Sequence, residues 1–438
     1  MKKIAFYTLG CKVNQADTAS MEGIFRKAGY QVVPFTEQAD IYLINTCVVT
    51  NEGQRKSRQI INRAIRKHPL SLVVVTGCYP QTARDEVKSI EGIDVIIGNQ
   101  ERSRIVELVE QALEQKTHQV LDNVQQMTVE TTFEEMGVGT ETDKTRAFLK
   151  IQEGCNQYCT YCIIPYARGP LRSRSLEGIK EEIAKLVAAG YKEIVLIGIH
   201  LGCYGKELAK QGIKLTLYDA VKAALSVPGV RRLRLGSLES VEVEPRLLEL
   251  MQEDKRLQPH LHLPLQSGCD KVLQNMHRPY DTARFRKLLE DIRAVLPEVA
   301  ITTDVIVGFP GETEADFEAT KRFAEQCGFA KMHIFPYSKR KGTPAESMPD
   351  QVEESLKAKR AAELAELDHR LQLQALQAKL GKVEEVLFEQ PVDSNHIEGL
   401  CGPYMRVVVE APVELCGDIA PVKITGIQDD WLVGELVK

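Results

Sequence analysis

The sequence contains no long apolar run. No stretch of its 438 residues approaches the roughly 20 consecutive apolar residues that a membrane span needs. The N-terminal segment MKKIAFYTLGC starts with basic residues, but its apolar run stops at once and the chain turns polar at Lys12. That pattern does not match a secretory signal. We therefore expect a cytoplasmic protein without a membrane partner, in a compartment that keeps thiols reduced.

The chain also lacks an excess of positive charge. Its formal net charge is −5, so no overall basic field points to a nucleic acid, and any RNA-binding site must be a local patch. Hydrophobic residues make up 43% and charged residues 27%, which is an ordinary globular composition. The length predicts about two to four domains. We find no internal repeat.

A local cysteine motif lacks the fourth ligand of a closed metal site. The segment EGCNQYCTYCIIPYARGP places Cys155, Cys159 and Cys162 in the spacing C-x3-C-x2-C, and the next histidine is His200. Structural zinc sites and closed iron–sulfur clusters use four protein ligands, whereas three ligands leave one metal position open for a reacting molecule. The spacing favours an iron–sulfur cluster with one open iron over a zinc knuckle or a coincidence.

Three further cysteines each follow a predicted strand. Cys11 comes after FYTLG, Cys47 after YLINT and Cys78 after VVVTG. Any one of them could be a small buried residue, because free cysteine is among the most buried residue types. Ligands of an open parallel sheet bind outside the carboxyl ends of its strands, so three cysteines at equivalent places predict a second three-cysteine metal site.

Hydrophobic patterning predicts an α/β protein. Residues 1–115 alternate short β-branched runs with amphipathic helices, which favours an open parallel sheet. Residues 116–145 are polar and acidic, as is typical of a linker. The alternation resumes over residues 146–350 with about six units, fewer than the eight of a closed barrel, so we expect a partial (β/α)6 barrel.

The C-terminal part changes character. Residues 351–381 are rich in Ala, Leu, Glu, Lys and Arg and predict a long connecting helix that stops at Gly381. Residues 382–438 contain four short predicted strands divided by Gly, Pro and Asp, which predicts a small all-β barrel or sandwich.

These motifs resemble a known family. The three-cysteine motif, with the aromatic Tyr161 before its last cysteine, is similar to the signature of radical S-adenosylmethionine enzymes. The segments LGCKVNQAD, INTCVVT, VTGCYPQ, EGCNQYCTYCIIPYARG, RSR, HLPLQSG and DVIVGFPGET together resemble the methylthiotransferase family over essentially the whole chain. The terminal β segment is similar to the TRAM module, an OB-like barrel.

The resemblance implies the cofactors and the reaction. In the family, the local motif holds a 4Fe–4S cluster whose open iron is chelated by S-adenosylmethionine, and the strand-end cysteines hold a second 4Fe–4S cluster that carries sulfur. One S-adenosylmethionine methylates that sulfur, and another yields a radical that removes a substrate hydrogen. Such a C–H bond is beyond side-chain acid–base chemistry, so we assign no catalytic acid or base. The resemblance also implies an electron donor such as flavodoxin or ferredoxin and a sulfur source, and we expect a monomer.

The substrates differ between branches of the family. TLGCKVNQ followed by NTCVVT most resembles the branch that modifies carbon 2 of N6-threonylcarbamoyladenosine at tRNA position 37. The branch for isopentenyladenosine in tRNA tends to read GCQMN there, and the branch for a ribosomal-protein aspartate reads GCPKN. We expect the first substrate. The other two substrates, and a non-enzymatic RNA-binding or cluster-carrier protein, remain as alternatives.

Other positions are expected to contact cofactor or substrate. Ser237 and Glu239 follow a predicted strand, where they could hydrogen-bond a ribose. The segment GFPGET could approach the cofactor closely through its glycines, or it could simply be a turn into a helix capped by Thr313. The expected cofactor-binding residues are Tyr161, Ser237, Glu239, Gly308 and Gly311, and the expected substrate-binding residues include His262 and Gln266. His262 could equally be an interior residue.

Two basic groups could meet tRNA phosphates. The first consists of Arg55, Lys56 and Arg58, and the second of Arg168, Arg172 and Arg174. A charge run is usually a solvated face, but a tRNA substrate favours contact by both groups. Residues 382–438 hold four Lys/Arg against eleven Asp/Glu, a net of −7, so charge disfavours phosphate binding by the terminal domain.

Overall fold

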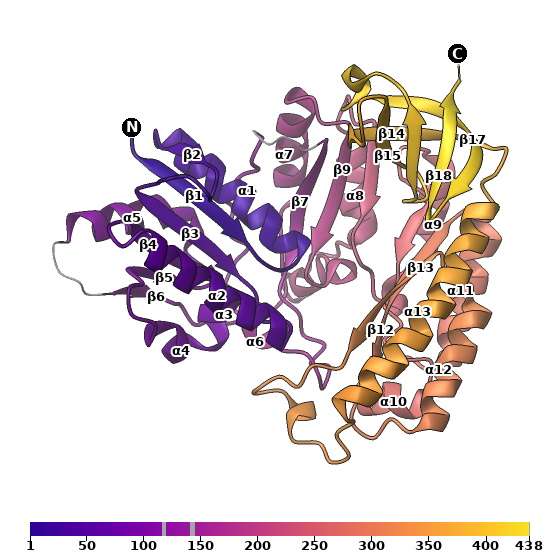
Figure 1. The fold of residues 1–438 in the computed structure, drawn as a ribbon, viewed down its shortest axis with the longest axis horizontal. Helices are drawn as coiled ribbons and strands as arrows, with labels where there is room; N and C mark the ends of the chain where they lie inside the picture. Colours follow the sequence, from indigo (N-terminus) through magenta and orange to yellow (C-terminus); the bar gives the residue numbers. More distant parts are fainter. Residues whose placement is uncertain (116–119, 141–144, 438) are drawn as a thin grey trace.

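The computed structural model describes residues 1–115, 120–140 and 145–437. An N-terminal α/β domain is followed by a curved array of strands and helices, one long helix and a closed barrel (Figure 1). This arrangement confirms the expected mixed α/β class with a small terminal β-barrel. Within the described ranges, no helix combines the length and the apolar character that crossing a membrane requires.

The N-terminal domain contains a six-stranded parallel sheet with the order β2-β1-β3-β4-β5-β6. Its strands are β1 (Lys3–Thr8), β2 (Gln31–Val33), β3 (Ile41–Thr46), β4 (Leu72–Gly77), β5 (Val95–Ile97) and β6 (Leu121–Asn123). Its helices are α1 (Lys12–Lys27), α2 (Asn51–Lys67), α3 (Cys78–Thr82), α4 (Arg84–Lys88) and α5 (Ile105–Glu114), with the 3-10 turn η1 (Arg102–Arg104).

Helices cover both faces of this sheet. Leu43 of β3 pairs with Val74 of β4, and their side chains join a core with Phe25 of α1 and residues of α5. The next pair in register, Ile44 and Val75, faces the opposite core with α2 and α3. Continuous apolar runs suit strands that are buried on both faces, which is why β3 and β4 show no polar alternation.

The segment expected to be a linker, residues 116–145, contributes to this domain instead. Its strand β6 pairs with β5 at the sheet edge, and Glu134 accepts a hydrogen bond from the Ser103 N–H (2.8 Å). The Ser20 hydroxyl donates to the Gly137 carbonyl (2.5 Å). A three-residue strand is too short to show a periodic pattern, so local sequence contains no sign of it. Residues 116–119 and 141–144 of this prediction lie outside the described residues.

Six parallel strands form the central region as two adjoining sheets. The first has the order β10-β9-β7-β8, in which the short β8 is antiparallel, and the second has the order β11-β12-β13. Bridges between Ser237 and His262 and between Leu233 and Leu257 connect the sheets into an open, partial barrel. The strands are β7 (Arg146–Glu153), β8 (Arg172–Ser173), β9 (Glu193–Gly198), β10 (Arg232–Leu235), β11 (His260–His262), β12 (Ala300–Val307) and β13 (Lys331–Pro336).

Helices surround this partial barrel, and a longer one leads out of it. The surrounding helices are α6 (Ile164–Arg168), α7 (Leu176–Ala188), α8 (Leu217–Leu225), α9 (Pro245–Glu253), α10 (Asp270–Asn275), α11 (Thr282–Val295) and α12 (Glu314–Cys327). Helix α13 (Glu354–Gln377) then runs beside β13, where Asp368 accepts a hydrogen bond from the Met332 N–H (2.6 Å). This helix carries the chain to the C-terminal barrel (Figure 1).

The C-terminal barrel is closed with the strand order β14-β15-β16-β18-β17. Its strands are β14 (Val383–Pro391), β15 (His396–Cys401), β16 (Arg406–Glu410), β17 (Ile419–Gln428) and β18 (Trp431–Leu436). The sequence did not predict β15, which contains Gly399. A Cβ at Gly399 would lie 2.1 Å from the Leu387 carbonyl oxygen, so the close approach of β14 requires the glycine that weakened the strand pattern.

Candidate iron–sulfur centres and the cavity beside them

Three cysteines of the N-terminal domain meet at one edge of its sheet. Cys11, Cys47 and Cys78 lie just past the carboxyl ends of β1, β3 and β4, which are neighbours in the sheet. A Cβ on Gly10 would lie 3.1 Å from the Cys47 sulfur, so the loop that carries Cys11 passes directly against Cys47. The structure therefore brings the three strand-end cysteines together, although they are far apart in sequence.

The surroundings of these cysteines suit metal-binding sulfur. The Cys78 sulfur accepts hydrogen bonds from Arg168 Nε (3.3 Å) and Asn99 Nδ2 (3.6 Å). Burial, reinforced by the neighbouring Cys78 thiol, raises the pKa of Cys47 to about 11. Cys11 is exposed to the cavity, but the protein around its thiol limits solvation and raises its pKa, against the lowering effect of the Arg168 cation. Such thiols become ligands when a cation binds beside them and stabilises their thiolate form.

The second set of cysteines follows β7. The Cys155 sulfur lies 3.5 Å from His200 Nδ1 and accepts a hydrogen bond from the Gln157 N–H (3.4 Å). The Cys159 sulfur accepts one from Arg278 Nη1 (3.2 Å). Burial raises the pKa of Cys162 to about 12, with a further contribution from the neighbouring Cys159 and Cys155 thiols. This loop thus presents three sulfurs with positively charged or polar neighbours.

Arg278 connects this loop to two of the expected cofactor-binding residues. Its guanidinium pairs with the Glu239 carboxylate and donates to the Tyr161 hydroxyl (3.4 Å). Tyr280 accepts two further hydrogen bonds from it, at 3.0 and 3.1 Å. Sequence reasoning missed Arg278, because nothing in the segment HRPY marks a residue that reaches Cys159 from another strand–helix unit.

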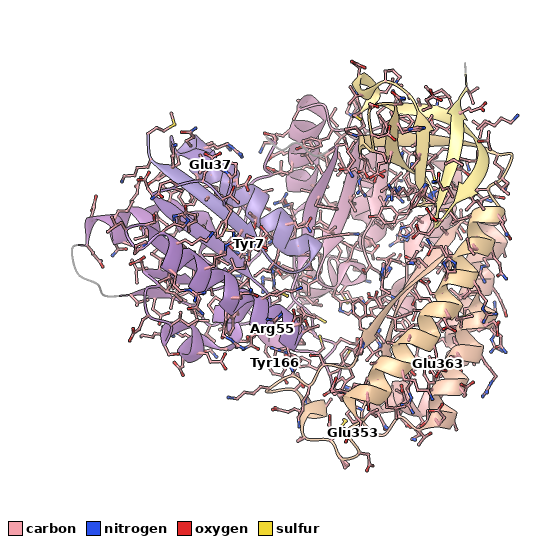
Figure 2. All side chains as sticks on the ribbon, viewed as in Figure 1. Tyr7, Glu37, Arg55, Tyr166, Glu353 and Glu363 are labelled. Carbon is pink, nitrogen blue, oxygen red and sulfur yellow. The ribbon has the colours of Figure 1, made fainter. Side chains whose placement is uncertain are left out.

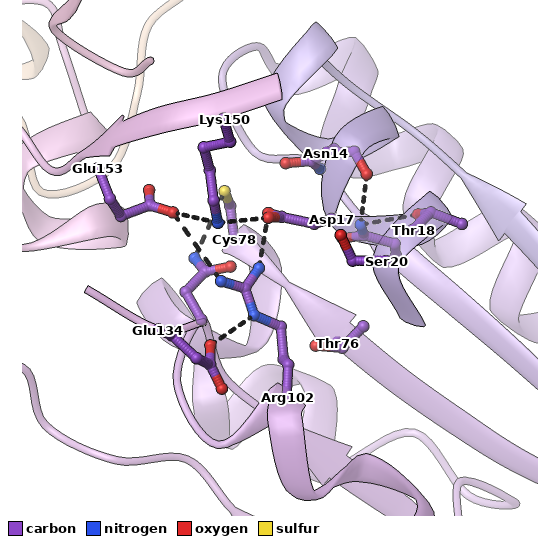
Figure 3. A network of polar contacts seen from close by, with 12 residues as sticks. Asn14, Asp17, Thr18, Ser20, Thr76, Cys78, Arg102, Glu134, Lys150 and Glu153 are labelled. Carbon is purple, nitrogen blue, oxygen red and sulfur yellow. Dashed lines mark hydrogen bonds and ion pairs between the residues drawn. The ribbon is translucent and has the colours of Figure 1, made fainter. Parts of the chain in front are cut away.

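A buried network of charges lies beside Cys78 and reaches Glu153, two residues before Cys155 (Figure 3). Asp17 of α1 pairs with Arg102 (2.6 Å) and with Lys150 of β7 (2.5 Å), and Lys150 also pairs with Glu153 (2.8 Å). Burial opposes the ionisation of Asp17, but the cations of Arg102, Lys150 and Arg168 outweigh it and hold its pKa well below the usual range. The network fixes the N-terminal domain against the partial barrel.

The second basic group does not form a surface for tRNA. Arg168, Arg172 and Arg174 are only 0%, 2% and 4% exposed. Arg168 bridges Asp17 (3.0 Å) and Glu153 (3.1 Å), so its charge is used inside the molecule. Arg172 and Arg174 are buried beside the same domain boundary, which places all three guanidinium groups out of reach of phosphates. The prediction that these arginines contact tRNA phosphates was wrong, because the local sequence does not show that the N-terminal domain packs against this segment.

A cavity of about 810 Å³ opens where the N-terminal domain, the partial barrel and the C-terminal barrel meet. Cys11 lines it directly, and Ile164 and Ile199 line it next to the second cysteine site. The lining also includes residues of α1, of β9 to β13, of α13, and of β15, β16 and the loop between them. One space therefore extends from Cys11 past the ends of the barrel strands.

Only some of the expected contact residues lie on this cavity. Ser237 and His262 line it, and His262 Nδ1 lies 2.9 Å from the Thr302 hydroxyl. Tyr161, Glu239 and Gln266 are not part of the lining, and Gln266 has a left-handed backbone (φ 65°).

The glycines of GFPGET lie elsewhere. A Cβ on Gly308 would lie 2.3 Å from Lys357 Cγ of α13, and the Gly311 N–H donates to the Asp350 carbonyl (2.9 Å). Thr313 caps α12 in a capping box with Asp316. These contacts favour the simple alternative of a turn into a capped helix over cofactor contact.

Comparisons with known proteins agree with this architecture. Residues 3–98 match the model of "Uncharacterized protein family UPF0004", and residues 149–324 match that of the Radical SAM superfamily. The chain is 41% identical to "Threonylcarbamoyladenosine tRNA methylthiotransferase MtaB" of Bacillus subtilis, an alignment that covers 100% of this chain and 97% of the relative. A "tRNA-2-methylthio-N(6)-dimethylallyladenosine synthase" of Pelotomaculum thermopropionicum is 33% identical, and the alignment covers 100% of this chain and 98% of that relative.

The chain belongs to the methylthiotransferase family of radical SAM enzymes. A solved structure of the radical S-adenosylmethionine methyltransferase TsrM from Kitasatospora setae, with cobalamin and a [4Fe-4S] cluster bound, shares the fold. Its TM-score is 0.57 at 14% identity, over 79% of this chain and 77% of that one. OxsB, a cobalamin-dependent S-adenosylmethionine radical enzyme, gives a TM-score of 0.54 at 13% identity, and the match covers 84% of this chain and 56% of OxsB.

Membership of this superfamily implies that the methylthiotransferase uses a 4Fe–4S cluster and S-adenosylmethionine. The cysteines after β7 fall within the matched residues 149–324 and fit that cluster, because they offer three thiols and no fourth cysteine in the loop. The Arg278 and His200 contacts supply hydrogen-bond partners for their sulfurs.

The first basic group lies on the surface of the methylthiotransferase. Arg55, labelled in Figure 2, projects from α2 with a side chain that is 60% exposed, and Lys56 is 56% exposed. Both pair with Glu52, at 2.6 and 3.6 Å, and Arg58 lies 3.8 Å from Glu86. These surface pairs are weak, so the three cations remain accessible to phosphates.

Among the residues that the structure describes, two further side-chain clusters could hold a metal ion. His200, Cys203 and Glu242 form one beside Cys155, and His262, Asp304 and His333 form the other on the cavity lining. Within the first, His200 Nε2 lies 3.1 Å from Glu242, and the Cys203 thiol donates to the same carboxylate (2.8 Å). In the second, His262 Nε2 lies 3.2 Å from Asp304. These internal pairs explain the clusters without an ion, so we assign no metal to them.

Proposed function

We propose that this enzyme adds a methylthio group to carbon 2 of N6-threonylcarbamoyladenosine at tRNA position 37. The observation that carries the proposal is the 41% identity over the whole chain to a relative named for that substrate. Relatives with the same name from Aquifex aeolicus and Thermotoga maritima are 38% and 36% identical, over 87% and 99% of this chain.

The strand-end cysteines hold a second 4Fe–4S cluster in this proposal. Three sulfurs at one sheet edge, with Arg168 and Asn99 donating to one of them, provide the thiolate donors and counter-charge that such a cluster needs. Cys11 lies on the cavity, so a substrate in the cavity would lie beside this site. When bound, the two clusters and S-adenosylmethionine supply the radical and sulfur chemistry.

The side chains of the enzyme itself bind the substrate and position the cluster ligands. Arg278 contacts both the Cys159 sulfur and the Glu239 carboxylate and so fixes their relative positions. The Asp17 network keeps the distance between the two cysteine sites constant. The cavity encloses the adenine and its substituent and keeps bulk water from the reacting carbon. The exposed cations on α2 contact tRNA phosphates outside the cavity.

The other parts of the reaction come from outside the chain. An electron donor such as flavodoxin or ferredoxin reduces the cluster after β7, and a separate source supplies sulfur. A tRNA substrate places the enzyme in the cytoplasm, where it acts as a monomer.

A second candidate substrate has specific support. Relatives named for dimethylallyladenosine are 33% and 34% identical over essentially the whole chain, so the scaffold serves both kinds of tRNA adenosine. The two candidates differ in the group attached to adenosine, which is an acidic amino-acid derivative in one and an apolar chain in the other.

Nucleoside mass spectrometry tests the proposal. The gene is deleted, and tRNA nucleosides are compared with those of a strain that carries the gene on a plasmid. We expect methylthio-threonylcarbamoyladenosine to disappear and to return with the plasmid, while the unmethylthiolated nucleoside accumulates. Loss of methylthio-isopentenyladenosine instead would assign the second substrate. The plasmid with alanine at all three cysteines after β7 is the matched control.

A further inference from the structure

One lysine on the cavity lies next to a cluster ligand and has no counter-ion. Lys12 is the first residue of α1, lines the cavity and is exposed. Among the residues that the structure describes, no carboxylate forms an ion pair with it; its amino group lies 5.5 Å from the Tyr404 ring centre and 6.0 Å from that of Phe148. A cation is disfavoured at a helix N-terminus, so an anion is needed to stabilise it there.

The other cations of the lining are neutralised by carboxylates. Arg234 pairs with Glu193 (3.0 Å), Lys331 with Asp368 (2.8 Å) and Arg406 with Glu398. The lining also contains the carboxylates Asp304 and Asp430, of which Asp304 pairs with His262 (3.2 Å). Among the lysines and arginines of this lining, Lys12 is therefore the one without a carboxylate partner in the described part of the chain. Its ammonium group is available to pair with an anionic ligand.

Three cationic side chains surround Tyr404 of the C-terminal barrel. Besides Lys12, the guanidinium carbons of Arg234 and Arg146 lie 4.7 and 5.5 Å from the Tyr404 ring centre, and Arg146 donates to its hydroxyl (3.3 Å). Burial opposes the ionisation of Tyr404, but these cations outweigh it and lower its pKa. Of these three cations, Arg234 pairs with Glu193 and Arg146 pairs with Glu389 (2.6 Å), whereas Lys12 has no carboxylate partner among the described residues.

A buried histidine adds an unused polar atom at the same place. His260 lines the cavity, is 5% exposed, and packs against Tyr404 at 4.8 Å between ring centres. Its Nε2 lies 3.0 Å from the Thr302 hydroxyl, whereas its Nδ1 is buried without a hydrogen-bond partner in the described part of the chain. A buried polar atom without a partner indicates a place for a ligand group or water.

We infer that Lys12, His260 and Tyr404 form a subsite for the free carboxylate and hydroxyl of the threonyl group. The inference rests on the proposed function, because the threonylcarbamoyl substituent carries both groups. Lys12 pairs with the carboxylate, and His260 Nδ1 exchanges a hydrogen bond with the hydroxyl. A dimethylallyl substituent offers neither partner, so Lys12 favours the acidic substrate. The C-terminal barrel contributes Tyr404 and so takes part in substrate binding through the cavity rather than through phosphates.

Binding of two matched RNAs to the reconstituted holoenzyme tests this subsite. One probe is an anticodon stem-loop with threonylcarbamoyladenosine, and the other carries the threoninamide analogue, which keeps the shape but removes the negative charge. Fluorescence anisotropy gives the two dissociation constants under anaerobic conditions. We expect the wild type to bind the acid roughly 10- to 100-fold more tightly than the amide, as a charge-assisted hydrogen bond provides.

The variants separate charge from structure. Lys12→Gln is expected to bring the ratio of the two dissociation constants close to unity, and Lys12→Arg to keep most of it. Lys331→Gln is the matched control, because Lys331 is also on the cavity but already pairs with Asp368, and it should leave the ratio as in the wild type. Iron content is measured for each variant, so that a disturbed Cys11 is recognised.

Two results would overturn the inference in different ways. If the wild type methylthiolates the acid probe, but Lys12→Gln with full iron content keeps the wild-type ratio, the subsite is wrong and the proposed function stands. If the wild type converts neither probe but converts one with isopentenyladenosine, the proposed function fails and the subsite fails with it.

Discussion

Arg55 and Arg168 carry the same guanidinium group in opposite surroundings. The side chain of Arg55 is 60% exposed and pairs with Glu52 on its own helix, whereas that of Arg168 is fully buried between Asp17, Glu153 and the Cys78 sulfur. When a surface cation is removed, its partner carboxylate is solvated by water at little cost in free energy. Removing a buried one leaves carboxylates without a counter-charge in a medium that does not solvate them.

Arg168→Ala should therefore destabilise the protein far more than Arg55→Ala. We expect the free energy of unfolding to fall by about 3–5 kcal/mol for the buried arginine and to change by less than about 0.5 kcal/mol for the exposed one. Urea unfolding of the apoproteins measures both values, so that cluster loss does not contribute. Equal effects would contradict the buried network as a source of stability.

The cysteines predict a defined iron content. Anaerobic reconstitution should give about eight irons per chain, and alanine at either complete set of three cysteines should leave about four. Cys416→Ala is the matched control, because Cys416 lies in the C-terminal barrel outside both sets, and it should keep about eight. About four irons in the wild type, and none after replacement of the cysteines that follow β7, would mean that the strand-end cysteines bind no cluster.

At the scale of elements, one carboxylate anchors the C-terminal barrel to the partial barrel. Glu193 at the start of β9 pairs with Arg232 (2.9 Å) and Arg234 (3.0 Å) of β10. Those arginines donate to the Leu400 carbonyl (3.1 Å) and the Gly402 carbonyl (2.9 Å). A single buried anion thus fixes two strands and the loop that forms part of the cavity.

This anchor predicts a pH dependence with a definite sign. Burial opposes the ionisation of Glu193, but Arg234 and Arg232 outweigh it and lower its pKa. The unfolded pKa of a glutamate is about 4.3, so the stabilisation is fully present above that pH and is lost as the pH falls towards the lower folded pKa.

Urea midpoints measured between about pH 6 and pH 3 check this. Glu193→Gln should be less stable than the wild type at neutral pH, and the difference should shrink as the pH falls through that range. Glu177→Gln, on the exposed part of α7, should run parallel to the wild type. A constant difference between wild type and Glu193→Gln across the range would contradict the assignment.

At the scale of the whole molecule, the distribution of charge matters more than its sum. The chain carries a net −5, yet its exposed α2 presents Arg55, Lys56 and Arg58, and its cavity presents Lys12. In the proposed function, the first group binds phosphates independently of RNA sequence, and the cavity distinguishes the substituent on the base.

Replacing Arg55, Lys56 and Arg58 together by alanine should weaken the binding of modified and unmodified tRNA alike. The slope of log affinity against log salt concentration should fall by about one for each phosphate that the variant no longer neutralises. Filter binding over a range of salt concentrations measures both. Lys287→Ala, an exposed lysine on α11, should leave the slope unchanged, and an unchanged slope in the triple variant would exclude α2 as a tRNA surface.

Much of the fold followed from local pattern. Most strands of the two α/β regions and the long α13 were predictable because periodicity and chain length are local properties. The strands β2, β6, β8 and β15 were not. The first three are only two or three residues long, and β15 contains a glycine that β14 requires. Pairing with a neighbouring strand makes these segments strands, and the neighbour is not visible in the local sequence.

The sequence by itself determined the chemistry of this protein, and the tertiary structure decided where its charges act. Cysteine spacing identified one set of metal-binding candidates and position after predicted strands identified the other, because both features can be read from the local sequence. Only the fold showed that Arg168 is internal, that Arg278 reaches Cys159, and that Lys12, His260 and Tyr404 meet across three regions. Burial and ion pairing depend on residues that are far away in sequence, and these contacts form only when the domains pack together.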